Sequence, residues 1–143
     1  MNIALLAHDR RKELMVQFCI AYCGILSRHT LSATNTTGKL VTEATGLPIS
    51  LYMSCSQGGD KQIASRISYN ELDMVLYFCD PMLHDGYQNS VMSIIRLCDQ
   101  YNVPFASNVA TAEVLIHGLE NGDLNWRDIV NPKSGAKSGA QGR

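Results

Sequence analysis

Asp60 follows two glycines in the run Gly58-Gly59-Asp60 and has the chemistry of a general base. A carboxylate with an ordinary pKa of about 4 is ionised at neutral pH, and it can take a proton from an acidified C–H within its reach. The charge that then develops on the neighbouring oxygen needs a neutral histidine, a lysine or backbone N–H groups to stabilise it. The alternative role for Asp60 is structural, as the N-cap of the helix that follows.

A second group of residues suits an anion. Thr34, Thr36 and Thr37 place hydroxyl groups at the start of a predicted helix, where backbone N–H groups favour phosphate. Taken alone, such threonines are more typical of a simple helix cap. Lys12 and Ser54 follow neighbouring predicted strands, so the five side chains together predict a phosphate pocket.

The cysteines do not have the spacing of a metal site. There are five, at positions 19, 23, 55, 79 and 98, without a CxxC pair. They are typical of buried, reduced thiols in a cytosolic protein. The spacing therefore argues against a zinc site, and we expect no cofactor.

The polar residues follow the ends of predicted strands. Short apolar runs alternate with amphipathic stretches along the chain. Strands are predicted over residues 3–7, 29–33, 49–53, 73–79 and 104–107, and helices over 10–26, 37–44, 60–69, 90–101 and 111–119. This alternation predicts one doubly wound α/β domain, with a mostly parallel five-stranded sheet flanked by helices. Such sheets bind ligands beyond the carboxyl ends of their strands.

The composition of the chain limits the class of protein and the kinds of partner that it can have. The chain has 143 residues, of which 45% are hydrophobic and 17% charged, enough to bury a core. A net charge of −1 and short apolar runs argue against a nucleic-acid or membrane partner. The first residues lack the basic region of a signal peptide, so we expect a cytoplasmic protein.

The last residues differ in kind from the rest. Residues 132–143 hold three glycines and no large apolar side chain, which indicates a flexible tail or a cloning remnant. The domain is predicted to cover residues 1–131, with nine basic and 13 acidic side chains and a net charge of −4.

Five motifs follow one another at the predicted strand ends. They are Ala7-His8-Asp9 with Lys12; residues 33–40 (ATNTTGKL); Ser54 with residues 58–62 (GGDKQ); Phe78-Cys79-Asp80-Pro81; and residues 102–104 (NVP) with 108–112 (NVATA). Together they resemble the methylglyoxal synthase family, collinearly from residue 2 to about residue 131.

The resemblance implies a cytoplasmic lyase that converts dihydroxyacetone phosphate to methylglyoxal and inorganic phosphate, without a metal. It implies that Asp60 removes a proton next to the carbonyl, giving an enediol(ate) that expels phosphate. It also implies a homohexamer, with Arg96 near the subunit contacts or simply at the surface, and inhibition by inorganic phosphate. The implied phosphate ligands are Lys12, Thr34, Asn35, Thr36, Thr37, Ser54 and Cys55, beside the ligand-binding His8 and the supporting carboxylates Asp9 and Asp80.

Three departures from the family pattern are single substitutions. Asn35 stands where the family has glycine, and asparagine is the residue that best tolerates a positive φ after glycine. Cys55-Ser56 replaces Gly-Pro, and the Cys55 side chain is expected to crowd the backbone approach to phosphate. Lys61 stands where the family usually has glutamine.

The fourth departure concerns a family histidine that contacts the reacting end of the substrate. Counted without a gap, its position is Tyr87, and the further acidic position of the same element is Ser90. His84-Asp85 occurs three residues earlier. Either His84 serves from a rebuilt loop, or Tyr87 donates a hydrogen bond with less freedom to shuttle protons.

The alternative function is a non-catalytic domain that binds phosphate or a phosphorylated effector, as the same fold does in carbamoyl phosphate synthetase. Fold alone does not decide between the two. Asp60 favours the enzyme, because a phosphate sensor needs no base there. The altered residues 55–56 and 84–90 favour the sensor or a changed substrate.

Overall fold

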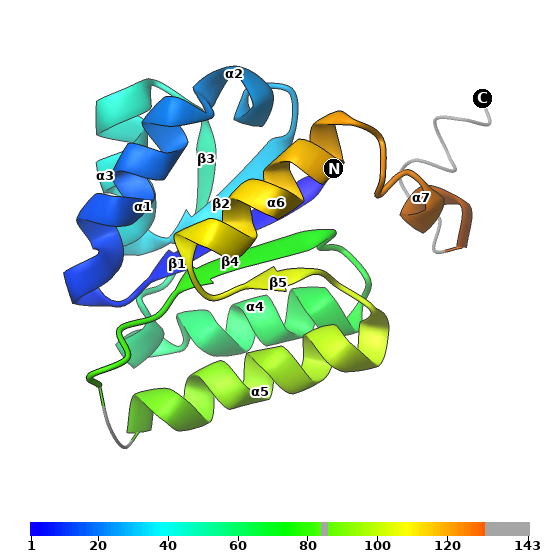
Figure 1. The fold of residues 1–143 in the computed structure, drawn as a ribbon. Coiled ribbons are helices and arrows are strands. Elements are labelled where there is room, and N and C mark those ends of the chain that lie inside the picture. The colour runs from blue at the N-terminus through cyan, green and yellow to red at the C-terminus, as the bar shows by residue number, and fades with distance from the viewer. Residues whose placement is uncertain (84–85, 131–143) are drawn as a thin grey trace.

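The computed structural model describes residues 1–83 and 86–130, and for residues 86–89 it gives the helical backbone alone. A central sheet is covered by helices on both faces (Figure 1). Its strands are β1 (Asn2–Ala7), β2 (Thr30–Thr34), β3 (Ile49–Tyr52), β4 (Met74–Phe78) and β5 (Phe105–Ala106), in the order β3-β2-β1-β4-β5. Every pairing is parallel, so the doubly wound class is confirmed and the sheet is wholly parallel.

The helices divide between the two faces of the sheet (Figure 1). One face carries α1 (Lys12–Ala21), α3 (Asn35–Thr45) and α6 (Val109–Glu120), and the other carries α4 (Gly59–Ser68) and α5 (Gly86–Tyr101). The short elements are α2 (Cys23–Leu26), α7 (Trp126–Val130) and the 3-10 turns η1 (Asp9–Arg11) and η2 (Cys55–Gln57). Alternate residues of β1 pack into opposite layers of the core, as the period of a strand requires.

Two helical segments differ from the sequence prediction. The single helix predicted over residues 10–26 is wrong, because α1 and α2 are separated at Tyr22. The Tyr22 ring packs against Phe18 and its hydroxyl donates to Glu113 of α6 at 2.9 Å. This tertiary contact has no local signal. The short helix α7 was not predicted.

Arg127 of α7 fastens the amino end of the sheet. Its side chain is wholly buried, and so is that of Asp73, which precedes β4. Asn70 and Asn102 follow α4 and α5 with φ of 57° and 55°, the left-handed conformation common after a helix end. Arg127 donates to the Asp73 carboxylate and the Asn70 side-chain oxygen, each at 3.3 Å, and to the carbonyls of Leu72 and Asn102.

The cysteines are free, as predicted for reduced thiols. Burial raises the pKa of Cys19 and of Cys98 to about 12, so both stay protonated. Across residues 1–83 and 86–130, no helix combines the length and the apolar character needed to cross a membrane.

Candidate active site

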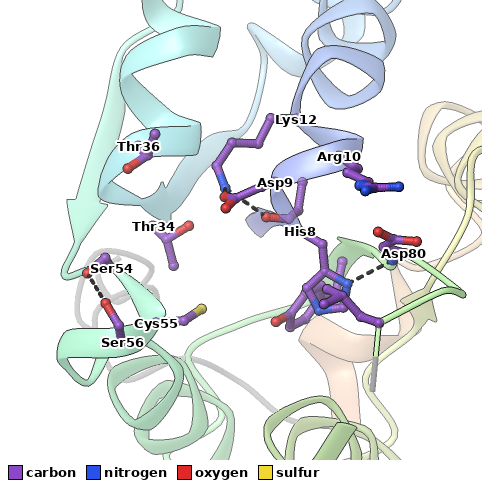
Figure 2. Close-up of a pocket in the computed structure, with 13 residues that line it drawn as sticks. His8, Asp9, Arg10, Lys12, Thr34, Thr36, Ser54, Cys55, Ser56 and Asp80 are labelled. Carbon is purple, nitrogen blue, oxygen red and sulfur yellow. Dashed lines mark hydrogen bonds and ion pairs between the residues drawn. The ribbon is translucent and has the colours of Figure 1, made fainter. Parts of the chain in front are cut away.

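A pocket of about 530 Å³ opens beyond the carboxyl ends of the strands, where the fold class predicts a ligand site (Figure 2). The loops after β1, β2, β3 and β4 all contribute to its wall. Its lining residues are Ala7, His8, Asp9, Arg10, Lys12, Thr34, Thr36, Ser54, Cys55, Ser56, Tyr77, Asp80 and Leu83.

The pocket gathers eight of the predicted site residues. These are His8, Asp9, Lys12, Thr34, Thr36, Ser54, Cys55 and Asp80. Asn35, Thr37 and Asp60 are not among the lining residues. His84 lies outside the described residues, and so does the side chain of Tyr87.

Lys12 stands at the mouth of the pocket, held by Asp9 (Figure 2). Its ammonium lies 2.5 Å from Asp9 Oδ1 and donates to the Ala7 carbonyl at 3.3 Å. The hydrogen bond from Lys12 lowers the pKa of Asp9. Because the Asp9 side chain is 95% exposed, the pair costs little to open, and the Lys12 charge is available to an anion.

Two threonine side chains at the start of α3 do not make the hydrogen bonds that their positions allow. Thr34 is the N-cap residue, yet its side chain makes no capping hydrogen bond. The Thr37 side chain is 1% exposed, and its hydroxyl has no hydrogen-bond partner among the described residues. A buried hydroxyl without a partner costs about 1–3 kcal/mol.

Asn35 differs from the expectation. It is the first residue of α3, and the non-glycine residues with positive φ in the described chain are Asn70 and Asn102. The idea that Asn35 replaces glycine by tolerating a positive φ is therefore wrong. The helix simply begins one residue after Thr34.

His8 is held as a neutral ring in the wall of the pocket. Its Nδ1 accepts a hydrogen bond from the Asp80 backbone N–H at 2.8 Å (Figure 2). Burial lowers the pKa of His8, and the nearby Asp80 charge offsets part of that effect. An accepting Nδ1 assigns the proton of the neutral imidazole to Nε2.

Two glycines bring Asp60 to the start of α4. Gly58 has a φ of 105°, and a Cβ on Gly59 would lie 2.0 Å from the Met53 carbonyl oxygen, so neither position accepts a side chain without rearrangement. The N-cap of α4 is Gly58, with no side-chain cap. The alternative role of Asp60 as the N-cap is therefore wrong.

The Asp60 carboxylate lies beside the pocket without lining it. It accepts a hydrogen bond from Ser90 Oγ of α5 at 2.8 Å. Burial raises the pKa of both Cys55 and Tyr77, and the Asp60 charge adds to the rise in each. The carboxylate is thus close to two residues of the pocket wall.

Sequence reasoning missed several residues of this region. Tyr77 looked like pure core in an apolar strand, but it lines the pocket, and its ring meets that of His8 edge-on at 5.3 Å between centroids. Arg10 adds a second cation to the wall, and its place in the loop after β1 was a usable signal. Within the described residues, no group of three His, Cys, Asp or Glu side chains is arranged to hold a metal ion.

Comparison with known proteins gives one answer. The model of the MGS-like domain family matches residues 15–107. The methylglyoxal synthase of Caldicellulosiruptor saccharolyticus is 56% identical over 133 residues, which are 93% of this chain and 94% of that protein. The methylglyoxal synthase of a Geobacillus species is 48% identical over 97% of this chain and 99% of its own.

A solved structure agrees with the sequence relatives. The crystal structure of methylglyoxal synthase from Elizabethkingia anophelis NUHP1 superposes with a TM-score of 0.76 at 40% identity, covering 80% of this chain and 76% of that one. The resemblance drawn from the strand-end motifs is confirmed. The chain belongs to the methylglyoxal synthase family.

Proposed function

We propose that the chain converts dihydroxyacetone phosphate to methylglyoxal and inorganic phosphate, with Asp60 as the general base. The observation that carries the proposal is the Asp60 carboxylate beside a pocket that has Lys12 and the start of α3 in its wall. A base beside a pocket with an anion-binding wall suits a phosphorylated substrate with an acidic C–H.

The phosphate group of the substrate binds at the Lys12 wall. The ammonium of Lys12 supplies charge, and the N-terminus of α3 supplies backbone N–H groups. The Thr37 hydroxyl, buried without a partner in the described chain, gains one on binding. Thr34, Asn35 and Thr36 of the same turn, and the backbone of Ser54 and Cys55 after β3, complete the proposed set.

Local groups must do this work because the domain is acidic. Residues 1–131 carry a net charge of −4, so long-range attraction of a phosphate dianion is weak. A lysine, hydroxyl groups and a helix N-terminus act at short range and are effective despite that charge.

The reaction then runs in three balanced steps. Asp60 removes a proton from the hydroxymethyl carbon, and the C–H electrons form the double bond of an enediolate whose carbonyl oxygen takes the negative charge. As the C–O bond breaks, phosphate leaves with the bond electrons, the enediolate double bond shifts toward the carbon that bore phosphate, and the hydroxyl on the deprotonated carbon, C1, becomes the aldehyde. The C1 hydroxyl proton passes to the enolate oxygen, which leaves the enol of methylglyoxal. The terminal carbon of that enol gains a proton as the enol hydroxyl loses one, which gives methylglyoxal, and the proton held by Asp60 passes to the released phosphate.

The developing charge on the carbonyl oxygen needs a hydrogen-bond donor. His84 and Tyr87 are the two candidates from the sequence, and both lie outside the described side chains. His8 binds the ligand as a neutral imidazole with its proton on Nε2. Asp80 supports His8 through its backbone N–H, and Asp9 supports Lys12 through the ion pair.

An assay with dihydroxyacetone phosphate tests the proposal. We expect methylglyoxal and phosphate to form in equal amounts, and Asp60→Asn to lower kcat by roughly 10²–10⁴-fold, the usual contribution of a general base. The matched control is Asp99→Asn, an exposed carboxylate of α5. Phosphate binding by the unaltered chain without any turnover would instead establish the non-catalytic effector-binding domain.

The remaining family expectations stay proposals. We infer a cytoplasmic homohexamer that inorganic phosphate inhibits by competing for the Lys12 wall. Arg96 lies exposed on α5, where a subunit contact would reach it. Light scattering after size-exclusion chromatography measures the assembly, and an Arg96→Glu variant that leaves the mass unchanged would remove Arg96 from that contact.

A further inference from the structure

We propose that Ser90 is a positioning residue, which fixes the plane of the Asp60 carboxylate and leaves Oδ1 as the oxygen that takes the proton. This inference rests on the proposed function, because it gives a role to a neighbour of the proposed base.

The contact that carries the inference joins two different helices. Ser90 Oγ, in the second turn of α5, donates to Asp60 Oδ2, in the first turn of α4, at 2.8 Å. The two helices lie side by side on one face of the sheet (Figure 1). Among the described residues, Ser90 is the hydrogen-bond partner of this carboxylate, and Oδ1 has none.

A carboxylate held by a short side chain still rotates about its last torsion. That torsion has a broad, roughly two-fold profile, so packing alone defines the orientation of the two oxygens weakly. One hydrogen bond to Oδ2 fixes the orientation and points Oδ1 elsewhere. Proton abstraction depends steeply on such alignment, because the oxygen must meet the C–H in a near-attack geometry.

A neutral donor suits this task better than a charged one. A lysine or arginine would orient Asp60 but would also stabilise its ionised form and weaken it as a base. An ionised carboxylate at position 90 would have no proton to donate. The serine hydroxyl orients the base and adds no charge to it.

The inference predicts a loss in kcat without a loss in substrate binding. Removal of the hydrogen bond that orients the carboxylate should lower kcat about 10–100-fold. The phosphate wall at Lys12 is built from other elements, so KM and the affinity for inorganic phosphate should stay within about twofold.

Kinetics of four variants test this. Ser90→Ala and Ser90→Cys both remove the strong donor, and cysteine keeps the size of the side chain, while Ser90→Thr keeps the hydroxyl and should recover most of kcat. Ser93→Ala, an exposed serine of the same helix, should match the unaltered chain. Inorganic phosphate binding verifies that each variant is folded.

The outcomes separate the two proposals. If the unaltered chain does not turn over dihydroxyacetone phosphate, the proposed function fails. If it does and Ser90→Ala keeps kcat within about twofold, or raises KM alone, the role of Ser90 is overturned. Adding Ser90→Ala to Asp60→Asn should lower kcat no further, since the serine acts through that carboxylate, and a further loss would also overturn it.

Discussion

Buried polar groups lie at both ends of the β-sheet, and the two ends differ in how far hydrogen bonds satisfy these groups. At the amino end, the Arg127 guanidinium has four acceptors, and Asp73 takes part in holding β1 through the Asn2 N–H at 2.8 Å. At the carboxyl end, the equally buried Thr37 hydroxyl has no partner among the described residues. The Lys12 ammonium there is paired with an exposed carboxylate.

The buried polar groups at the amino end suit a role in stability, and those at the carboxyl end suit a role in ligand binding. A buried charge is tolerated when hydrogen bonds satisfy it, and the amino end fits that rule, so its charges hold α7 and two helix ends to the sheet. The carboxyl end leaves the Thr37 hydroxyl without a partner among the described residues, at a cost in stability, which is typical of a site that a ligand completes. Substitutions at the amino end should therefore change the free energy of unfolding, and substitutions at the carboxyl end should change the affinity for phosphate.

The largest expected effect is at the amino end. Arg127→Met leaves the Asp73 carboxylate buried without its cation, so the free energy of unfolding should fall by about 3–5 kcal/mol. Urea denaturation measures this. The matched control is Arg28→Met, which removes an exposed pair with Glu120 and should cost less than about 1 kcal/mol. Equal losses in the two variants would contradict a special role for the amino-end cluster.

Lys12→Met should produce the opposite result at the carboxyl end. Loss of a charged donor to phosphate should weaken inorganic phosphate binding about 10–100-fold, measured by isothermal titration. The free energy of unfolding should change by less than about 1 kcal/mol, because Asp9 is exposed. Lys39→Met, an exposed lysine of α3 outside the pocket lining, should leave both unchanged. A large loss of stability without a loss of affinity would make Lys12 a structural residue.

Thr37→Val sharpens the comparison within a single helix. The methyl group fills the same space, and removal of a partnerless buried hydroxyl should leave stability unchanged or raise it by about 1 kcal/mol, while phosphate affinity falls. Thr45→Val at the other end of α3 is the control, because its hydroxyl donates to the Val41 carbonyl at 2.7 Å. That variant should lose about 1 kcal/mol and keep its affinity. Thermal and chemical denaturation in the presence and absence of phosphate distinguish the two.

Sequence reasoning found the fold because its signals are local. The apolar strand around Leu76 and the regular alternation of strands and helices are visible along the chain, and the sheet then follows from general topology. The same topology predicts that His8, Lys12 and Thr34 lie at one edge of the sheet, and all three line the pocket there.

The contacts that the sequence could not give are those between distant residues. Arg127 lies 54 positions from Asp73, and Ser90 lies 30 positions from Asp60, with no periodic pattern to connect either pair. Tyr77 points to the pocket from a strand whose pattern is wholly buried. Long-range pairing of this kind is decided by packing, which single-sequence patterns do not encode.

The smallest expected effect is a pH dependence that His8 gives to the carboxyl end. Burial lowers the pKa of His8 below its ordinary 6.5, so on acidification the unfolded chain binds a proton that the folded chain refuses. The contribution of His8 to stability is therefore full above pH 6.5 and is lost as the pH falls from there through the lowered folded-state pKa.

The variant His8→Asn keeps an acceptor for the Asp80 N–H and removes the titration. Its free energy of unfolding should therefore fall less between pH 7.5 and 5.5 than that of the unaltered chain, and the difference should equal the contribution of His8 protonation. His29, whose pKa burial also lowers, titrates in both proteins and cancels in the difference. Urea denaturation midpoints of both proteins, measured across this pH range, test the prediction. An equal pH dependence in the two proteins would mean that His8 keeps an ordinary pKa in the folded chain.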